Sequence, residues 1–309
     1  MRTFSLVACP SCAHTGSTTV SVGSTTLCRC AGCGLIYARE YADPDSIYVD
    51  GYLTGATEFG PPDVLNPIFQ EFLVYAGHQR MARAEAVVGG PGSMLDVGCG
   101  SGDVLVAATD RGWRAVGAEP VPESAEAAVA RGLEVHCAML QDSGVPEASF
   151  DLVTAYHVLE HMADSTGFLR LIARWARPGG HVLVEVPNWR SVHRRAGGEQ
   201  WIGLRPLEHI GHYTPKTLRD TIARAGLEPV KVATMGFPWE AQTFREALSD
   251  VGLNRFAGRL RRLSRQAPLR GDTLAVPNRA GWALVKGLLR AYDAAKIGQV
   301  VYAIGRVPT

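Results

Sequence analysis

From residue 93 onward, short apolar runs alternate with segments whose apolar residues recur at helical spacing. The strand-like runs are MLDVG, WRAVGAE, LEVHCA, FDLVTAY, HVLVEVP and EPVKVATM, and the helix-like segments are DVLVAATDRG, SAEAAVARG, FLRLIARWA and KTLRDTIARAG. This alternation is typical of a mostly parallel sheet covered by helices on both faces. We therefore predict a doubly wound α/β fold.

The flanking segments have other patterns. Residues 1–42 hold short Thr/Val/Ser-rich runs separated by glycines, which predict small hairpins. Residues 43–90 predict a linker and a helical lid, with helical spacing between positions 64 and 88. The main α/β core is expected over 91–239 and 297–309, ending in the strand-like IGQVVYAIGRV. Residues 240–296 would form a helical insertion before that last strand.

Composition indicates a globular chain with material for a large core. The 309 residues are 46% hydrophobic and 20% charged, and the net charge of +1 indicates no particular partner. No apolar run approaches the roughly 20 residues of a membrane-spanning helix, and the first ten residues lack a signal peptide's apolar stretch. We therefore expect a cytoplasmic protein.

A glycine-rich turn follows the first strand of the α/β region, in Asp96-Val97-Gly98-Cys99-Gly100-Ser101-Gly102. Glycines permit positive φ angles and let a ligand approach the backbone closely. A dinucleotide site has the pattern G-x-G-x-x-G and binds a pyrophosphate. Here the position three after Gly100 is Asp103, whose charge would repel phosphate. The turn therefore favours a ligand with a ribose and an amino-acid tail but no phosphate.

The second strand ends at Glu119, about 20 residues after the first glycine. A carboxylate at this position can accept hydrogen bonds from both ribose hydroxyls. Strand, glycine turn, helix and carboxylate together are the strongest functional signal in the chain.

On these residues, the stretch from about position 91 to 233 resembles the class I S-adenosylmethionine-dependent methyltransferases. The resemblance implies a Rossmann-like sheet with S-adenosylmethionine bound at its carboxyl edge. It places Asp96 and the three glycines near the methionine part of the cofactor and Glu119 on the ribose. In QDSGVPEASFDLVTAYHVLEHM, it implies that Tyr156 and His157 flank the methionine part.

The resemblance is incomplete at the adenine. The acidic residue that this family often places near adenine falls on Met139 here. The adenine would then be held by the backbone around Leu140 or by Asp142.

Five of the seven cysteines lie near the N-terminus. Cys9-Pro-Ser-Cys12 and Cys30-Ala-Gly-Cys33 are two C-x-x-C pairs about 17 residues apart, the four-thiolate spacing of a zinc ribbon. Cys28 could replace Cys30 as a ligand. So short a segment has too little core to fold alone, and Zn²⁺ would supply the stability. Four thiolates leave no open coordination position, so we expect a structural zinc ion.

Methyl transfer requires an aligned nucleophile and, for a hydroxyl or carbon acid, a group that removes its proton. Candidate bases follow the fourth and fifth strands, where parallel sheets bind ligands. They are His157, Glu160, His161, Glu208, His209 and His212.

Residues 186–227 resemble a branch of methyltransferases that act on sugars, polysaccharides and specialised metabolites. Zinc-carrying deoxysugar C-methyltransferases have a similar N-terminal module and a Tyr-x-Glu-His group after the corresponding strand. Arg205-Pro206-Leu207-Glu208-His209 keeps Glu-His but lacks the tyrosine. We expect His209 to be the base and Glu208 its orienting partner, and we favour O-methylation over C-methylation.

The insertion at 240–296 is basic, with eleven Arg and Lys against five Asp and Glu, so the rest of the chain carries −5. It would serve as a cap for a phosphorylated or lipid-linked acceptor, a peripheral membrane contact, or a homodimer contact. The patch lacks interleaved aromatics, which disfavours nucleic acid as a partner.

Together these features predict a methyltransferase for a sugar, glycan or specialised metabolite. One alternative is an RNA or protein methyltransferase whose zinc ribbon binds the macromolecule. Another is a non-catalytic protein that binds the cofactor for regulation.

Overall fold

The computed structural model describes residues 2–47, 67–236 and 289–309, together with Val49, Gly51, Ala56, Leu269, Arg270, Thr273, Leu274 and Gly287. Most of the basic insertion predicted at 240–296 lies outside these residues. Its described part includes a short antiparallel pair, β13 (Leu269–Arg270) with β14 (Thr273–Leu274).

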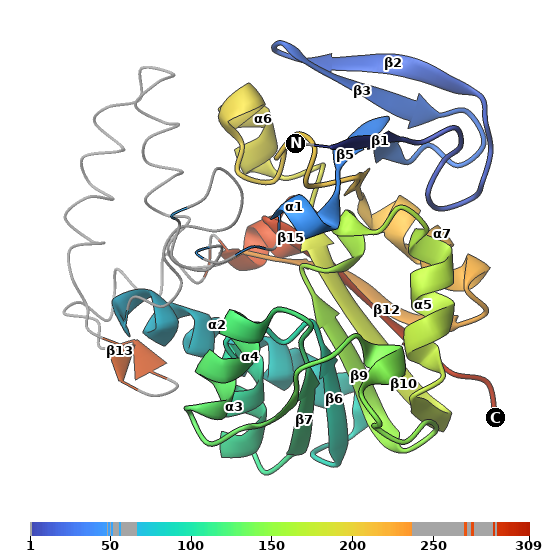
Figure 1. Cartoon of the computed structure of the whole chain (residues 1–309). Coiled ribbons are helices and arrows are strands. Elements are labelled where there is room, and N and C mark those ends of the chain that lie inside the picture. The colour runs from blue at the N-terminus through green and yellow to red at the C-terminus, as the bar shows by residue number, and fades with distance from the viewer. Residues whose placement is uncertain are drawn as a thin grey trace, which may run out of the picture.

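A seven-stranded sheet forms the centre of the molecule (Figure 1). Its order is β12-β15-β10-β9-β6-β7-β8, and all pairings are parallel except those of β15 with β10 and with β12. The strands are β6 (Ser93–Val97), β7 (Arg114–Ala118), β8 (Glu134–His136), β9 (Phe150–Tyr156), β10 (Ala176–Pro187), β12 (Glu228–Met235) and β15 (Val300–Arg306). The predicted α/β fold is confirmed, including the return of the last strand to the sheet.

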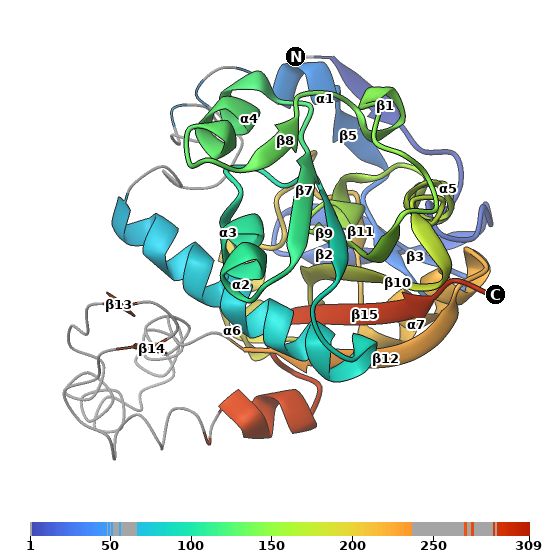
Figure 2. The same ribbon diagram turned by 90° about the horizontal axis from the view of Figure 1, so that it is seen from below.

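Helices cover both faces of this sheet, as Figure 2 shows. On one face lie α2 (Pro67–Val88) and α3 (Asp103–Asp110), and on the other α5 (Ser165–Ala173) and α7 (Pro215–Arg224). Since both faces are covered, every residue of β6 is buried and the strand is a continuous apolar run except for Ser93 and Asp96. The order of strands reverses beside β6, so the carboxyl ends of β6 and β9 flank the crevice where such sheets bind ligands.

Helix α2 differs from the expected lid. Ala76, Met81 and Ala84 are fully buried and pack with Leu105 of α3 beneath the sheet. The helix is therefore a layer of the core, and its inner face brings charged groups to the edge of the sheet.

Local sequence explains where the helices on the second face begin. The carboxylate of Asp164 accepts a 2.8 Å hydrogen bond from the amide of Gly167 at the start of α5. Thr214 and Thr217 form a capping box at the start of α7, with Pro215 in the first turn. The remaining helical segments are α1 (Pro44–Ile47), α4 (Pro122–Val129), α6 (Val192–Gly197), η1 (Leu140–Asp142), η2 (Leu159–His161) and η3 (Gly198–Gln200).

The N-terminal module forms a second, antiparallel sheet of order β11-β4-β3-β2. Three of its strands come from the expected module, β2 (Ser17–Val22), β3 (Thr25–Cys30) and β4 (Ile36–Tyr37). The fourth, β11 (Gly211–His212), comes from the α/β domain. A separate pair joins β1 (Thr3–Ser5) to β5 (Glu40–Ala42).

Candidate functional site

The glycine turn between β6 and α3 has the conformation that only glycine adopts readily. Gly98, Gly100 and Gly102 all have positive φ, at 70°, 55° and 81°. A Cβ on Gly98 would lie 2.7 Å from Cγ2 of Val158, so the backbone there approaches a neighbour closely. A Cβ on Gly100 would meet no atom within 4 Å. The turn therefore leaves space beside Gly100 where a ligand can approach the backbone.

Two buried carboxylates flank this turn. Asp96 is the next-to-last residue of β6, and its carboxylate accepts a 2.7 Å hydrogen bond from the hydroxyl of Thr154. Glu119 follows β7 and accepts 2.9 Å hydrogen bonds from the amides of Gly100 and Val121. Burial raises the pKa of Asp96 to about 7 and also raises the pKa of Glu119. Such groups would gain from hydrogen-bond donors supplied by a ligand.

The carboxyl end of β9 carries the next predicted residues. Tyr156 is buried, and its hydroxyl has no hydrogen-bond partner among the described residues. His157 has a positive φ of 57°, which is uncommon for a residue other than glycine, and its amide donates to the carbonyl of Glu185. This turn directs the half-exposed imidazole toward Glu160, with Nδ1 3.1 Å from the Glu160 carboxylate.

The predicted adenine contacts lie on η1. Leu140 is buried, whereas Met139 and Asp142 are exposed. The amide of Asp142 donates to the Met139 carbonyl, which closes the turn. These residues therefore follow β8 at the carboxyl edge of the sheet.

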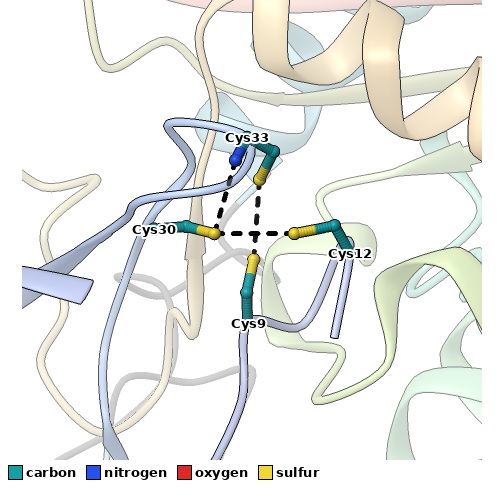
Figure 3. A group of neighbouring side chains, drawn as sticks. All are labelled: Cys9, Cys12, Cys30 and Cys33. Carbon is teal, nitrogen blue, oxygen red and sulfur yellow. Dashed lines mark hydrogen bonds between the residues drawn. The ribbon is translucent and has the colours of Figure 1, made fainter. Parts of the chain in front are cut away.

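The four predicted zinc ligands converge, as Figure 3 shows. The sulfur atoms of Cys9 and Cys33 are 3.6 Å apart, those of Cys12 and Cys30 are 3.5 Å apart, and all four lie within 4.8 Å of one another. Tetrahedral zinc with Zn–S bonds of about 2.3 Å holds thiolates roughly 3.8 Å apart. The site therefore fits Zn²⁺.

The fifth cysteine of the module lies outside this cluster. Cys28 and Cys30 both lie on β3, but Cys30 is the one whose sulfur belongs to the cluster of four, so Cys30 is the candidate ligand. The hydrogen bond between Cys9 and Cys33 lowers the pKa of Cys33, and the same contact raises the pKa of Cys9.

The candidate base His209 is buried in the segment before β11. Its Nδ1 lies 3.0 Å from the carbonyl of Gly203, which can only accept, so Nδ1 carries the hydrogen and Nε2 is left as an acceptor. Burial, with a contribution from His161, holds the pKa of His209 well below its usual value. Side-chain atoms of Glu160, His161 and His209 lie within 4.8 Å of one another, a donor set that also suits a divalent cation.

Glu208 does not orient His209. Its carboxylate accepts a 2.7 Å hydrogen bond from Nη1 of Arg205. The carbonyl of Gly203 takes the orienting position instead, because residues 205–209 form a turn in which the amides of Glu208 and His209 both donate to the carbonyl of Arg205. The expectation that Glu208 holds the ring of His209 is corrected on this point.

Comparison with known proteins identifies the family. A family model described as a methyltransferase domain matches residues 70–232, just over half of the chain. The chain belongs to this methyltransferase family. The prediction of an S-adenosylmethionine-dependent methyltransferase is thereby confirmed.

Curated relatives of this methyltransferase include two proteins named ubiquinone biosynthesis O-methyltransferase. The one from Ralstonia nicotianae is 26% identical over 236 residues, 70% of this chain and 87% of the relative. The one from Idiomarina loihiensis is 30% identical over 169 residues, 52% of this chain and 63% of the relative. A solved S-adenosylmethionine-dependent methyltransferase from Archaeoglobus fulgidus aligns with a TM-score of 0.49 at 16% identity, covering 75% of this chain and 94% of that one.

Two charged residues beside Tyr156 were missed in the sequence. Arg80 of α2 is buried and donates from Nε and one Nη to the carboxylate of Glu185 on β10, at 2.9 and 2.5 Å. Its guanidinium lies 4.9 Å from the ring centre of Tyr156. The sequence did offer a signal for this pair. Glu185 is the single acidic residue in the apolar run HVLVEVP, and a buried charge needs a partner of opposite charge.

No helix in the described part of the methyltransferase is both long and apolar enough to span a membrane.

Proposed function

We propose that this methyltransferase transfers the methyl group of S-adenosylmethionine to an acidic hydroxyl, of phenol type, on a small specialised metabolite. S-adenosylmethionine supplies an electrophilic methyl group on a positively charged sulfur. His209 is the general base that takes the hydroxyl proton. One observation carries this assignment: Nδ1 of His209 donates to the carbonyl of Gly203, which leaves Nε2 as the atom that can accept a proton.

The low pKa of His209 supports an acidic acceptor. Burial keeps the imidazole neutral at neutral pH, so it is ready to accept a proton. Because its pKa is low, the ring is a weak base and suits a hydroxyl near the phenolic pKa of about 10 better than a sugar hydroxyl. The name O-methyltransferase carried by the relatives also supports oxygen as the methylated atom.

The cofactor would occupy the crevice at the glycine turn. Glu119 would exchange its bonds to the turn amides for the two ribose hydroxyls. Asp96, the glycine turn, Tyr156 and His157 would contact the methionine part. The guanidinium of Arg80 lies next to the ring of Tyr156, so its positive charge would face the carboxylate of the cofactor's methionine part. Leu140 and Asp142 would hold the adenine.

The family match favours an enzyme over the regulatory alternative. Sugars and glycans are the alternative small acceptors of the methyl group. RNA and protein are the alternative macromolecular acceptors. Peripheral membrane contact, a lipid-linked acceptor and a homodimer rest on the basic insertion at 240–296, which lies mostly outside the described residues.

The test is methyl transfer to a panel of phenols, catechols and nucleotide sugars, followed by mass spectrometry, with His209→Ala beside the wild type. The variant should lose turnover by about 100-fold or more while its affinity for S-adenosylmethionine is unchanged. His181→Ala, in the N-terminal half of β10 and so away from the carboxyl edge of the sheet, is the matched control and should keep full activity. Methylation of sugars but not phenols would contradict the acidity argument, and full turnover by His209→Ala would contradict the base assignment.

The pH profile gives a second readout. Because the pKa of His209 lies well below its usual value, kcat/KM should stay level as the pH falls to about 6.5 and drop only at lower pH.

A further inference from the structure

The zinc module and the segment that carries His209 share one β-sheet. Strand β4 pairs with β3 of the module on one side and with β11 on the other, with Tyr37 opposite Gly211 and Ile36 opposite His212. We call residues 207–212 the catalytic segment. Its strand β11 therefore forms the edge of the zinc module's sheet, although β11 comes from a distant part of the chain.

Two further hydrogen bonds hold this segment from the module side. The amide of Ala38 donates to the carbonyl of Ile210, and the amide of Ala42 donates to the carbonyl of Leu207, each at 2.9 Å. Glu208 and His209 lie between these two anchored positions. The backbone on both sides of the candidate base is thus fixed by residues of the N-terminal module.

The α/β core holds the same segment from the other side. The amide of Ile210 donates to the carbonyl of Glu160 at 2.7 Å. Nδ1 of His161 lies 3.0 Å from the carbonyl of Glu208 and donates to it. The catalytic segment is therefore enclosed between the module and η2.

The first of the two cysteine pairs is attached to the core. The amide of Ser165, at the start of α5, donates to the carbonyl of Pro10, and the hydroxyl of Thr166 donates to the carbonyl of Ser11. The hydroxyl of Ser11 lies 2.8 Å from that of Thr221 on α7. These contacts are buried and link the Cys9-Cys12 turn to two core helices.

The second cysteine pair is attached to the catalytic segment. Cys30 ends β3, and the turn through Cys33 and Gly34 leads directly into β4. The amide of Cys30 donates to the carbonyl of Leu35 at 2.9 Å, which closes this turn. A shift of the second pair would therefore move β4 and, through the strand pairing, β11.

We propose that the zinc ion positions His209 for proton removal, by joining a cysteine pair fixed to the core to a cysteine pair that carries β4 and the catalytic segment. The proposal rests on the proposed role of His209. Zinc would hold the two pairs with its four thiolates and do no chemistry on the methyl group. Without it, two- and six-residue strands with little core of their own cannot fix this geometry, since such small modules depend on the metal for stability.

One pair of variants tests the zinc. Cys12→Ser removes a ligand, and Cys28→Ser removes a thiol of the same module that is not a ligand. Cys12→Ser should lose zinc and lower kcat by about 100-fold, the cost of misplacing a reacting group by about 1 Å. The affinity for S-adenosylmethionine, measured by calorimetric titration, should stay within about twofold of wild type. Cys28→Ser should match wild type in both.

A second pair tests the strand connection with zinc still bound. Ala38→Pro removes the N–H that donates to Ile210, whereas Ala38→Gly retains it. The proline variant should keep its zinc and its cofactor affinity but lose kcat, and the glycine variant should retain activity.

Hydrogen exchange gives a readout that does not depend on activity. The amides of Ile210 and of His212, the residue of β11 that forms a hydrogen-bonded pair with Ile36, should exchange at least about tenfold faster in Cys12→Ser and in Ala38→Pro, while those of β6 should not change. Unchanged exchange in the catalytic segment after zinc loss would overturn the proposal, and so would full kcat in Cys12→Ser. If exchange rises but His209→Ala retains turnover, the coupling would stand and the base assignment would fail.

Discussion

The carboxyl group of Asp96 gives the sharpest test of the electrostatics of the site. It is 2% exposed, and burial raises its pKa from 3.8 to about 7. Between these values the folded chain keeps a proton that the unfolded chain has lost. The contribution of Asp96 to stability is therefore largest below about pH 4 and declines as the pH rises to about 7.

Asp96→Asn removes this titration and keeps an oxygen that can accept the 2.7 Å hydrogen bond from Thr154. The full shift of about 3 pKa units corresponds to about 4 kcal/mol, of which about 2.5 kcal/mol falls between about pH 5 and about pH 8. Relative to wild type, the free energy of unfolding of the variant should rise by that amount across this range.

The assay is urea unfolding of both proteins at the two pH values without cofactor. Asp151→Asn is the matched control, because the Ser93 amide lowers the pKa of Asp151 to about 2. Its titration lies below the tested range, so its difference from wild type should be constant. A constant difference for Asp96→Asn as well would refute the argument that burial keeps this carboxyl protonated.

Two further predictions concern the cofactor. Gly98→Ala should reduce the affinity for S-adenosylmethionine by more than about tenfold, since φ is 70° and the new Cβ would lie 2.7 Å from Val158; calorimetric titration checks this, with unchanged affinity contradicting it. Glu119→Gln should weaken binding by about 10- to 100-fold, because an amide has one accepting oxygen where the carboxylate offers two and the lost bonds are charge-assisted. Wild-type affinity in Glu119→Gln would show that the ribose is held elsewhere.

The strands and helices of the α/β core were predictable because their signals are local. Mostly apolar runs such as that of β9, which only Asp151 and Thr154 interrupt, indicate burial on both faces of the sheet. The Gly98–Gly102 turn has a composition that few other structures require. The two C-x-x-C pairs were readable for the same reason, since the spacing within each pair sets the geometry of its own turn.

The partners of charged and catalytic groups were not predictable. Arg80 and Glu185 are 105 positions apart and meet only because α2 packs on the sheet beside β10. The expected pair of Glu208 with His209 rested on their adjacency, but Glu208 pairs with Arg205, and the carbonyl of Gly203 holds the ring of His209.

The sequence by itself determined the fold class, the glycine turn with its carboxylates and the four thiolate ligands, because each depends on residues close together in the chain or on the period of apolar positions. Only the tertiary structure decided that α2 is a core layer and that the zinc module's sheet ends in β11 next to His209. Such contacts join segments far apart in sequence, and their geometry follows from packing and backbone hydrogen bonding, to which residue spacing gives no direct access.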